Sequence, residues 1–340
     1  MVGVVICGGR RVESTIAVVG RGFEREGHDV AYLPTRDYSK PSPQAKFSAP
    51  DDIEEKLLAA VKSVDAKLIV WLMCKADYTP GLIARMRDRL PGVRWAYHSF
   101  DDPFIVDTGE FRVAAEFDFA ITCCEGSIAD YAGIDTPAIC LYPPFDEDMQ
   151  TNAPVKETEL CDMSFIATNM YPPARFPRSY RSRADIVRAL EPVGKLSLFG
   201  PWENRYNWGG EHGAPELKHL WRGALRFEQL APIYKASRIN LNSHVRPDGY
   251  LYLNERFTNV LGSGGFMMVD RVNGIEELQA DGKAFEIYDD IGDLVEKCRF
   301  YLANEEARLK IAAQGLALAR QRFSNTIFAR RTLEFSERLH

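Results

Sequence analysis

Short apolar runs alternate with amphipathic stretches along almost the whole chain. In the first half, residues 2–7, 29–33, 68–73, 94–98, 119–123 and 138–142 have the length and apolar character of buried strands. Between them, residues 13–26, 51–64, 81–90 and 127–132 have helical spacing, and Ile16, Val19 and Phe23 lie on one helix face. This alternation predicts βα units and a parallel sheet.

The second half repeats the alternation. We expect strands at residues 163–167, 195–199, 238–242, 266–269 and 284–288, and helices at 181–190, 227–235, 254–261, 291–302, 305–321 and 326–338. Residues 142–154 are rich in proline and polar residues without periodicity, which is typical of a linker. The sequence therefore predicts an α/β protein with two Rossmann-like, doubly wound domains facing a cleft, at 1–150 and 151–322. A terminal helix at 323–340 is expected to pack back on the first domain.

Composition restricts the class of protein. The chain has 340 residues, of which 46% are hydrophobic and 26% charged, as in ordinary soluble domains. The seven cysteines show no zinc-binding spacing, so we expect reduced thiols in a cytoplasmic protein without a membrane-spanning segment. The net charge of −6 argues against a nucleic-acid binder.

The densest group of polar residues follows the expected strand at 238–242. It contains Asn242, His244, Asn254, Glu255 and Arg256. A turn at Gly262, Ser263, Gly264 and Gly265 then leads into the next strand. Polar groups and a helix start at the carboxyl end of a strand favour an anionic ligand such as a nucleotide. We predict that Arg256 and the turn bind phosphate, and that Arg256→Ala weakens this binding while leaving the fold intact. The alternative is that Glu255 and Arg256 form a solvated ion pair.

An aromatic turn follows the strand at 195–199. Phe199, Gly200 and Trp202 present a flat apolar surface and free backbone groups, which suit a nucleobase. Arg222 and Gly223 are a candidate second edge of the same site. The alternative is a loop aromatic that only packs, which is the expectation for Trp208.

Two groups in the first domain are candidates for contact with a substrate. His98, Asp101 and Asp102 follow a strand, where one of them could act as a base or orient a hydroxyl. Alternatively, an aspartate caps the turn before Pro103 and His98 is only hydrogen-bonded. Gly8, Gly9 and Arg10 follow the first strand as a ligand loop or an ordinary tight turn. The sequence has no GxGxxG motif and no acidic residue after the second strand, which argues against an NAD site.

The sequence shows no metal-binding motif. There is no DxD between apolar flanks, and residues 146–148 read as a solvated acidic run in the linker. We therefore expect no bound metal and no cofactor.

The order of motifs resembles the CgeB-like, spore-protein-type glycosyltransferases of the GT-B fold. The resemblance runs through Asp162-Met-Ser-Phe-Ile, Phe199-Gly-Pro-Trp, Trp221-Arg-Gly, residues 233–242, Asn254-Glu-Arg-Phe, Gly264-Gly-Phe, Glu276-Glu-Leu, Tyr301-Leu and 308–321. In the first domain it includes Asp101-Asp-Pro and Cys124-Glu-Gly-Ser-Ile. It implies that the second domain binds a nucleotide-sugar co-substrate, that the first holds the acceptor, and that no metal is needed.

The chain departs from this family at two positions. Related GT-B enzymes often carry a ribose-binding glutamate where this chain has Asn259, and a second acidic residue where it has Leu251. Asn259 can bind a ribose hydroxyl without charge. A retaining mechanism is therefore not carried over from the family, and the stereochemical outcome stays open.

The predicted activity is transfer of a sugar, with UDP-sugars as the first donors to test, to an unidentified hydroxyl. The acceptor is left open and could be a glycan, a protein, a small molecule or modified DNA. The oligomeric state is open as well. A sugar-nucleotide epimerase of the same fold and a non-catalytic, coat-associated binding protein are the alternatives.

Overall fold

The computed structural model describes residues 1–9, 15–36, 52–72, 81–155, 157, 160–169 and 183–339. The chain divides into two compact units. The first is Met1–Pro144 together with Phe323–His340, and the second is Phe145–Arg322. The division after Pro144 falls a few residues before the boundary at 150 that the sequence suggested.

The first unit is built on a parallel sheet. Its described strands are β1 (Gly3–Gly9), β2 (Asp29–Arg36), β3 (Ala66–Leu72), β4 (Arg94–His98), β5 (Phe119–Thr122) and β6 (Ala138–Cys140), in the order β2-β1-β3-β4-β5-β6. Since all pairs are parallel, the carboxyl ends of the strands meet at one edge. The residues that follow β4 and β5 therefore lie close together.

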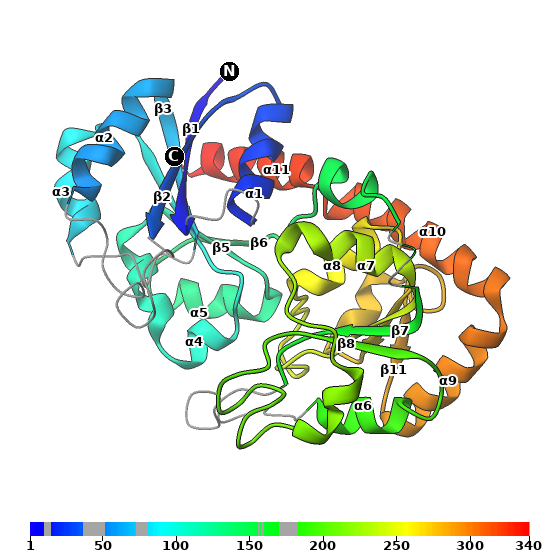
Figure 1. Ribbon diagram of the computed structural model, residues 1–340. Coiled ribbons are helices and arrows are strands. Elements are labelled where there is room, and N and C mark those ends of the chain that lie inside the picture. Colours follow the sequence, from blue (N-terminus) through cyan, green and yellow to red (C-terminus); the bar gives the residue numbers. More distant parts are fainter. Residues whose placement is uncertain are drawn as a thin grey trace. The chain divides into compact units, whose positions relative to one another are not determined.

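Helices cover both faces of this sheet (Figure 1). One face carries α2 (Ile53–Val64) and α3 (Leu82–Arg89), and the other carries α1 (Thr15–Arg25) and α11 (Asn325–Arg338). The short α4 (Phe104–Asp107) and α5 (Ile128–Ala132) follow β4 and β5. At Gly22 a Cβ would lie 2.1 Å from the Asn325 carbonyl oxygen, so glycine allows α1 and α11 to approach closely. The last helix of the chain thus completes the first core.

The second unit contains another parallel sheet. Its described strands are β7 (Cys161–Ile166), β8 (Leu196–Phe199), β9 (Ser237–Asn242), β10 (Met267–Asp270) and β11 (Glu286–Tyr288), in the order β11-β10-β9-β7-β8. The chain runs outward from β7 to β8 and then returns to the other side of β7. This reversal is the switch point at which doubly wound sheets bind ligands.

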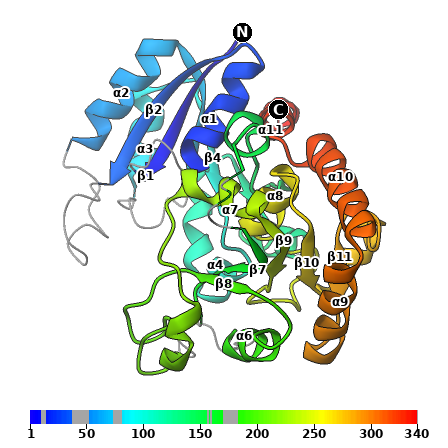
Figure 2. The ribbon, with the colours of Figure 1, turned by 45° about the vertical axis from the view of Figure 1, so that its right-hand side comes forward.

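Two sets of helices enclose the second sheet (Figure 2). The apolar cluster around Phe165 and Leu241 is covered by α6 (Ala184–Leu190), α9 (Ile291–Ala303) and α10 (Glu305–Arg322). α7 (Leu230–Ala236) and α8 (Glu255–Gly262) contact β9 on the opposite face. No helix in the described ranges is long and apolar enough to cross a membrane.

Candidate functional site

A hydrogen-bonded network joins the carboxyl ends of β7 and β9 to the start of α8. Asn242 and Asn254 exchange side-chain amide bonds of 3.1 and 3.0 Å. Asn254 Oδ1 also accepts a 3.0 Å bond from the Phe257 backbone and so caps α8. Arg256 donates to Asn242 Oδ1 and to the Ile166 carbonyl, both at 2.6 Å. The structure therefore brings three of the predicted donor-site residues together.

Arg256 supplies a positive charge and also holds this network together. Its guanidinium connects β7, β9 and α8, and lies 5.8 Å from the Phe165 ring centroid. Arg256→Ala would lose two charged hydrogen bonds, so we now expect this variant to be destabilised, in place of the intact fold expected from the sequence.

The neighbouring residues His244 and Glu255 are also fixed within the unit. His244 is buried, its Nδ1 lies 2.7 Å from Asp270 Oδ1, and its Nε2 accepts from the Asn254 backbone at 3.3 Å. Asp270 also accepts from the His244 backbone. Glu255 is the first residue of α8, where an acidic side chain complements the helix dipole. His244 thus orients the loop before α8.

The glycine turn caps the end of α8, which argues against the phosphate-binding role predicted for Ser263 and Gly264. The backbone N–H groups of Ser263, Gly264 and Gly265 donate to the carbonyls of Asn259, Leu261 and Val260. These bonds close the carboxyl end of α8, and Gly264 has the left-handed φ of +75° that such a cap requires. A helix of eight residues is about 12 Å long, so the turn lies far from Asn254. Its carbonyl-rich end carries partial negative charge, which disfavours phosphate.

The two predicted edges of the aromatic site are adjacent. The Gly200 N–H donates to the Gly223 carbonyl at 3.0 Å, and the Arg222 N–H donates to Leu198 at 2.8 Å. The Phe199 ring is buried. Trp202 lies against Trp221, with ring centroids 5.1 Å apart, and Lys218 Nζ lies 4.2 Å from the Trp202 centroid.

The Trp202 ring is also covered by backbone, since a Cβ on Gly209 would meet its Nε1 at 1.9 Å. Arg222 is exposed, and a Cβ on Gly223 would meet no atom within 4 Å. Arg222 and Gly223 are therefore accessible, whereas Trp202 is largely occupied by packing. Trp208 is fully buried and donates to Ala167, as the packing interpretation requires.

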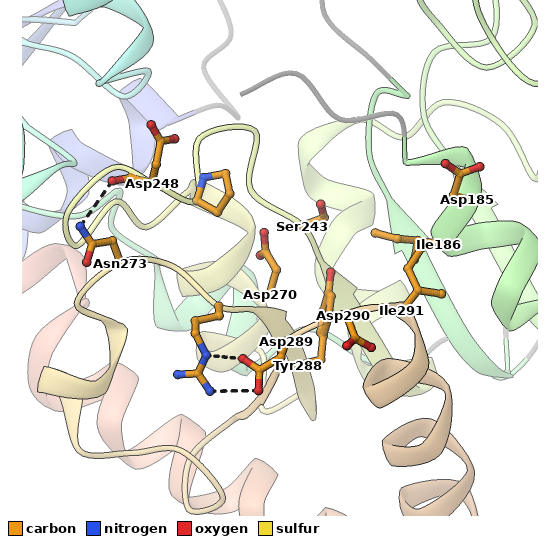
Figure 3. Close-up of a pocket in the computed structure, with 12 residues that line it drawn as sticks. Asp185, Ile186, Ser243, Asp248, Asp270, Asn273, Tyr288, Asp289, Asp290 and Ile291 are labelled. Atoms are coloured by element: carbon orange, nitrogen blue, oxygen red, sulfur yellow. Dashed lines mark hydrogen bonds and ion pairs between the residues drawn. The ribbon is translucent and has the colours of Figure 1, made fainter. Parts of the chain in front are cut away.

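A cavity of about 830 Å³ opens at the carboxyl ends of β9, β10 and β11 (Figure 3). Strand ends contribute Ser243, Asp270 and Tyr288, and the starts of α6 and α9 contribute Ile186 and Ile291. The other lining residues are Asp185, Pro247, Asp248, Arg271, Asn273, Asp289 and Asp290. Arg271 is paired with Asp289. Carboxylate, amide and hydroxyl groups of this kind match the hydroxyls of a sugar better than they match a diphosphate.

Sequence reasoning missed every residue that lines this cavity. These residues could have been found from the strand positions, because the residues that follow the strands of a parallel sheet all lie at the same edge of that sheet. Asp270 and Tyr288 are the last residues of β10 and β11. The prediction of the site was instead based on the polar and glycine residues at 254–265.

In the first unit, the three predicted catalytic residues have different environments. His98 is fully buried against the Phe100 and Phe328 rings, and neither ring nitrogen has a hydrogen-bond partner in the described ranges. Burial lowers the pKa of His98 to about 3. Asp102 is also buried and accepts from Ser99 Oγ at 2.8 Å and Tyr131 Oη at 2.9 Å. Asp101 is exposed. Of the three, only Asp101 offers its side chain to a soluble substrate.

The buried carboxyl of Asp102 predicts a pH-dependent stability. Burial raises its pKa from 3.8 to about 6, against the opposing effect of its hydrogen bonds. The folded state therefore binds a proton more tightly than the unfolded state, and stability falls as pH rises from about 4 to about 6. At about 1.4 kcal/mol per pH unit, the loss is on the order of 3 kcal/mol.

Urea unfolding of the parent and Asp102→Asn between pH 4 and pH 7 measures this loss. The difference in unfolding free energy between the two proteins should shift in favour of the variant as pH rises. A difference that stays constant across this range would show that Asp102 does not titrate as described.

The glycines of the first strand are explained by packing. Gly8 and Gly9 are the last residues of β1 rather than a loop after it. A Cβ on Gly8 would lie 2.7 Å from Ile16 Cδ1, so glycine admits α1. Arg10 lies outside the described residues. In the part of the chain that the structure covers, no group of three or more His, Cys, Asp or Glu side chains could hold a metal ion.

Comparison with known proteins gives one family match. Residues 179–334, just under half of the chain, match the family model described as glycosyl transferase-like. No curated protein matches the chain significantly. The matched range includes α8, the side chains of Asn242, Asn254 and Arg256, and all the residues that line the cavity, and it ends within α11 of the first unit.

Solved structures resemble the whole chain. Sucrose-phosphate synthase from Thermosynechococcus elongatus matches with a TM-score of 0.64 and 11% identity, over 100% of this chain and 99% of that one. HepE from Anabaena, in complex with UDP-glucose, has a TM-score of 0.63 and 12% identity, over 99% and 100%. The chain has the GT-B glycosyltransferase fold. A DNA-modifying β-glucosyltransferase shares this GT-B architecture at a TM-score of 0.57 and 11% identity, over 98% of each chain. The predicted α/β class, with two parallel sheets and the GT-B fold, is confirmed.

Proposed function

We propose that this protein transfers a sugar from a nucleotide-sugar donor, with UDP-sugars the first class to test, to a hydroxyl acceptor. The observation that carries the proposal is the glycosyltransferase-like domain at 179–334 within a GT-B fold. The motif order that suggested a CgeB-like transferase supports membership of that narrower group. Within the described ranges, six cysteines are buried as free thiols, which supports a location in the reducing cytoplasm.

The second unit is the proposed donor-binding part. Asn242, Asn254 and Arg256 form its polar centre, and the exposed Arg222 with Gly223 is the proposed base-binding edge. The cavity at the ends of β9 to β11 would take the sugar, whose hydroxyls can donate to carboxylates such as Asp185 and Asp290. The reaction is proposed to need no resident metal or cofactor.

The first unit is the proposed acceptor part. A hydroxyl attacking the anomeric carbon must lose its proton, and a carboxylate within reach can accept it. Asp101 is the candidate because it is exposed, whereas His98 and Asp102 are buried. Asp102 would hold the turn that carries Asp101, through its bonds to Ser99 and Tyr131.

Modified DNA stays open as the acceptor, because a DNA-modifying β-glucosyltransferase is among the similar structures. The net charge of −6 argues against it, since DNA binding draws on cationic surface. A salt-sensitive shift of DNA in a gel would support this acceptor.

A panel of nucleotide sugars tests the proposed function. A donor at about 100 times its Kd should stabilise the fold by about 2.7 kcal/mol, which thermal unfolding detects. Incubating the stabilising donor without acceptor should release the free nucleotide slowly, and EDTA should leave the rate unchanged. An isomerised sugar nucleotide would instead identify an epimerase. Binding without any turnover would favour the non-catalytic alternative, and no stabilisation by any donor would refute the proposal.

A further inference from the structure

Residues 145–153, here called the connecting segment, are structured rather than a loose linker. They contain a short π-helical turn at Glu147–Thr151. Asp146 caps the turn, accepting from the backbones of Asp148 at 2.8 Å and Met149 at 3.2 Å. The acidic run that the sequence suggested to be solvated thus begins with a buried capping residue.

The connecting segment is bound along α8. Gln150 Nε2 donates to Asn259 Oδ1 at 3.1 Å, and Thr151 Oγ1 donates to the Gly262 carbonyl at 2.6 Å. The Phe145 ring lies directly on Gly262, where a Cβ would meet ring atoms at 2.3 Å. Residues on the body and at the end of α8 therefore contact this segment.

Both polar atoms of the Gln150 side-chain amide form hydrogen bonds. Its Oε1 accepts from the Asp146 backbone at 2.7 Å while its Nε2 is bound to Asn259. Gln150 is 3% exposed and Asn259 is 1% exposed. Asn259 is therefore directed into the protein, where its amide oxygen already accepts a hydrogen bond, and it is poorly available to a ribose hydroxyl.

We propose that Gln150 and Asn259 are positioning residues for donor binding. Arg256 lies three residues before Asn259, so the two are neighbours on the surface of α8. A shift of α8 would draw Arg256 away from the Ile166 carbonyl and Asn242 Oδ1, both now at 2.6 Å. The amide pair holds α8 where these bonds form. This inference rests on the proposed function, because it assigns the pair a role in binding the nucleotide.

A double-mutant cycle tests the proposal with UDP as the probe. Calorimetry would compare the parent, Gln150→Ala, Asn259→Ala and the double variant, at a temperature where all are folded. We expect each single change to raise the Kd for UDP by about three- to tenfold, and the double change to add little, because neighbours that act through one contact are not additive. Gln314→Ala, at an exposed position on α10, is the matched control and should bind UDP normally.

Other outcomes would overturn the proposal in distinguishable ways. If Asn259→Ala weakens UDP but Gln150→Ala does not, Asn259 contacts the ligand. If neither change affects the Kd of a parent that binds UDP, the pair serves stability alone. If the parent binds neither UDP nor any nucleotide sugar, the proposed function fails and this inference with it. Should Asn259→Ala not fold, Asn259→Asp keeps an acceptor for Gln150 and is expected to retain UDP affinity within about threefold.

Discussion

Asp101→Asn is expected to lower the turnover number by about 100-fold or more, with the donor Kd unchanged. Asparagine has nearly the same shape but cannot accept the proton of the acceptor hydroxyl, and general base catalysis contributes about 10²- to 10⁴-fold. Because Asp101 is exposed, the change should not disturb the core. The measurement is the rate of transfer with the stabilising donor and its acceptor, together with calorimetric titration of the donor.

Two control variants separate catalysis from structure. Asp88→Asn, at an exposed position on α3, removes a similar charge and should retain full turnover. Asp102→Asn should act chiefly on stability and its pH dependence, because the side chain is buried. Undiminished turnover by Asp101→Asn would exclude Asp101 as the base.

Arg256→Ala is expected to weaken UDP binding at least tenfold and to destabilise the second unit at the same time. The variant removes a positive charge from the proposed donor site and leaves the Ile166 carbonyl and Asn242 Oδ1 without their bonds to the guanidinium. Bonds to charged groups contribute about 1.5–3 kcal/mol each, so a loss on the order of 3 kcal/mol is expected. Urea unfolding measures the stability, and calorimetry on the folded variant measures the affinity.

Arg256→Lys separates the effect on UDP affinity from the effect on stability. Lysine keeps the charge but lacks the planar fork that reaches both acceptors. It should recover part of the UDP affinity and little of the stability. If Arg256→Ala unfolds at the same urea concentration as the parent, the network around it is not stabilising. If UDP affinity also survives, Arg256 lies outside the donor site.

The strands of both sheets were predictable because their signal is local. The apolar runs at 94–98 and 238–242 correspond to β4 (Arg94–His98) and β9 (Ser237–Asn242). The helix expected at 305–321 is α10 (Glu305–Arg322). The turn at Glu147–Thr151 was missed, because it is stabilised by Asp146 and by contacts with α8 rather than by its own periodicity.

The candidate site was predictable only in part. Asn242, Asn254 and Arg256 do meet, because a strand end and the next helix start are close in sequence and in space. The phosphate-binding role was assigned to the glycine turn because a short polar segment has a similar sequence at either end of a helix. Free N–H groups point outward only at the amino end of a helix, and the glycine turn follows the carboxyl end of α8.

The sequence by itself determined the alternation of strands and helices, the two-domain α/β class and the group of polar residues before α8. These depend on side-chain periodicity and on chain neighbours. Only the tertiary structure decided that Asp101 is exposed while Asp102 is buried, that Asn259 binds Gln150, and that a cavity forms where β9, β10 and β11 end. Burial and hydrogen-bond partners come from residues distant in the chain, and only folding brings those residues together.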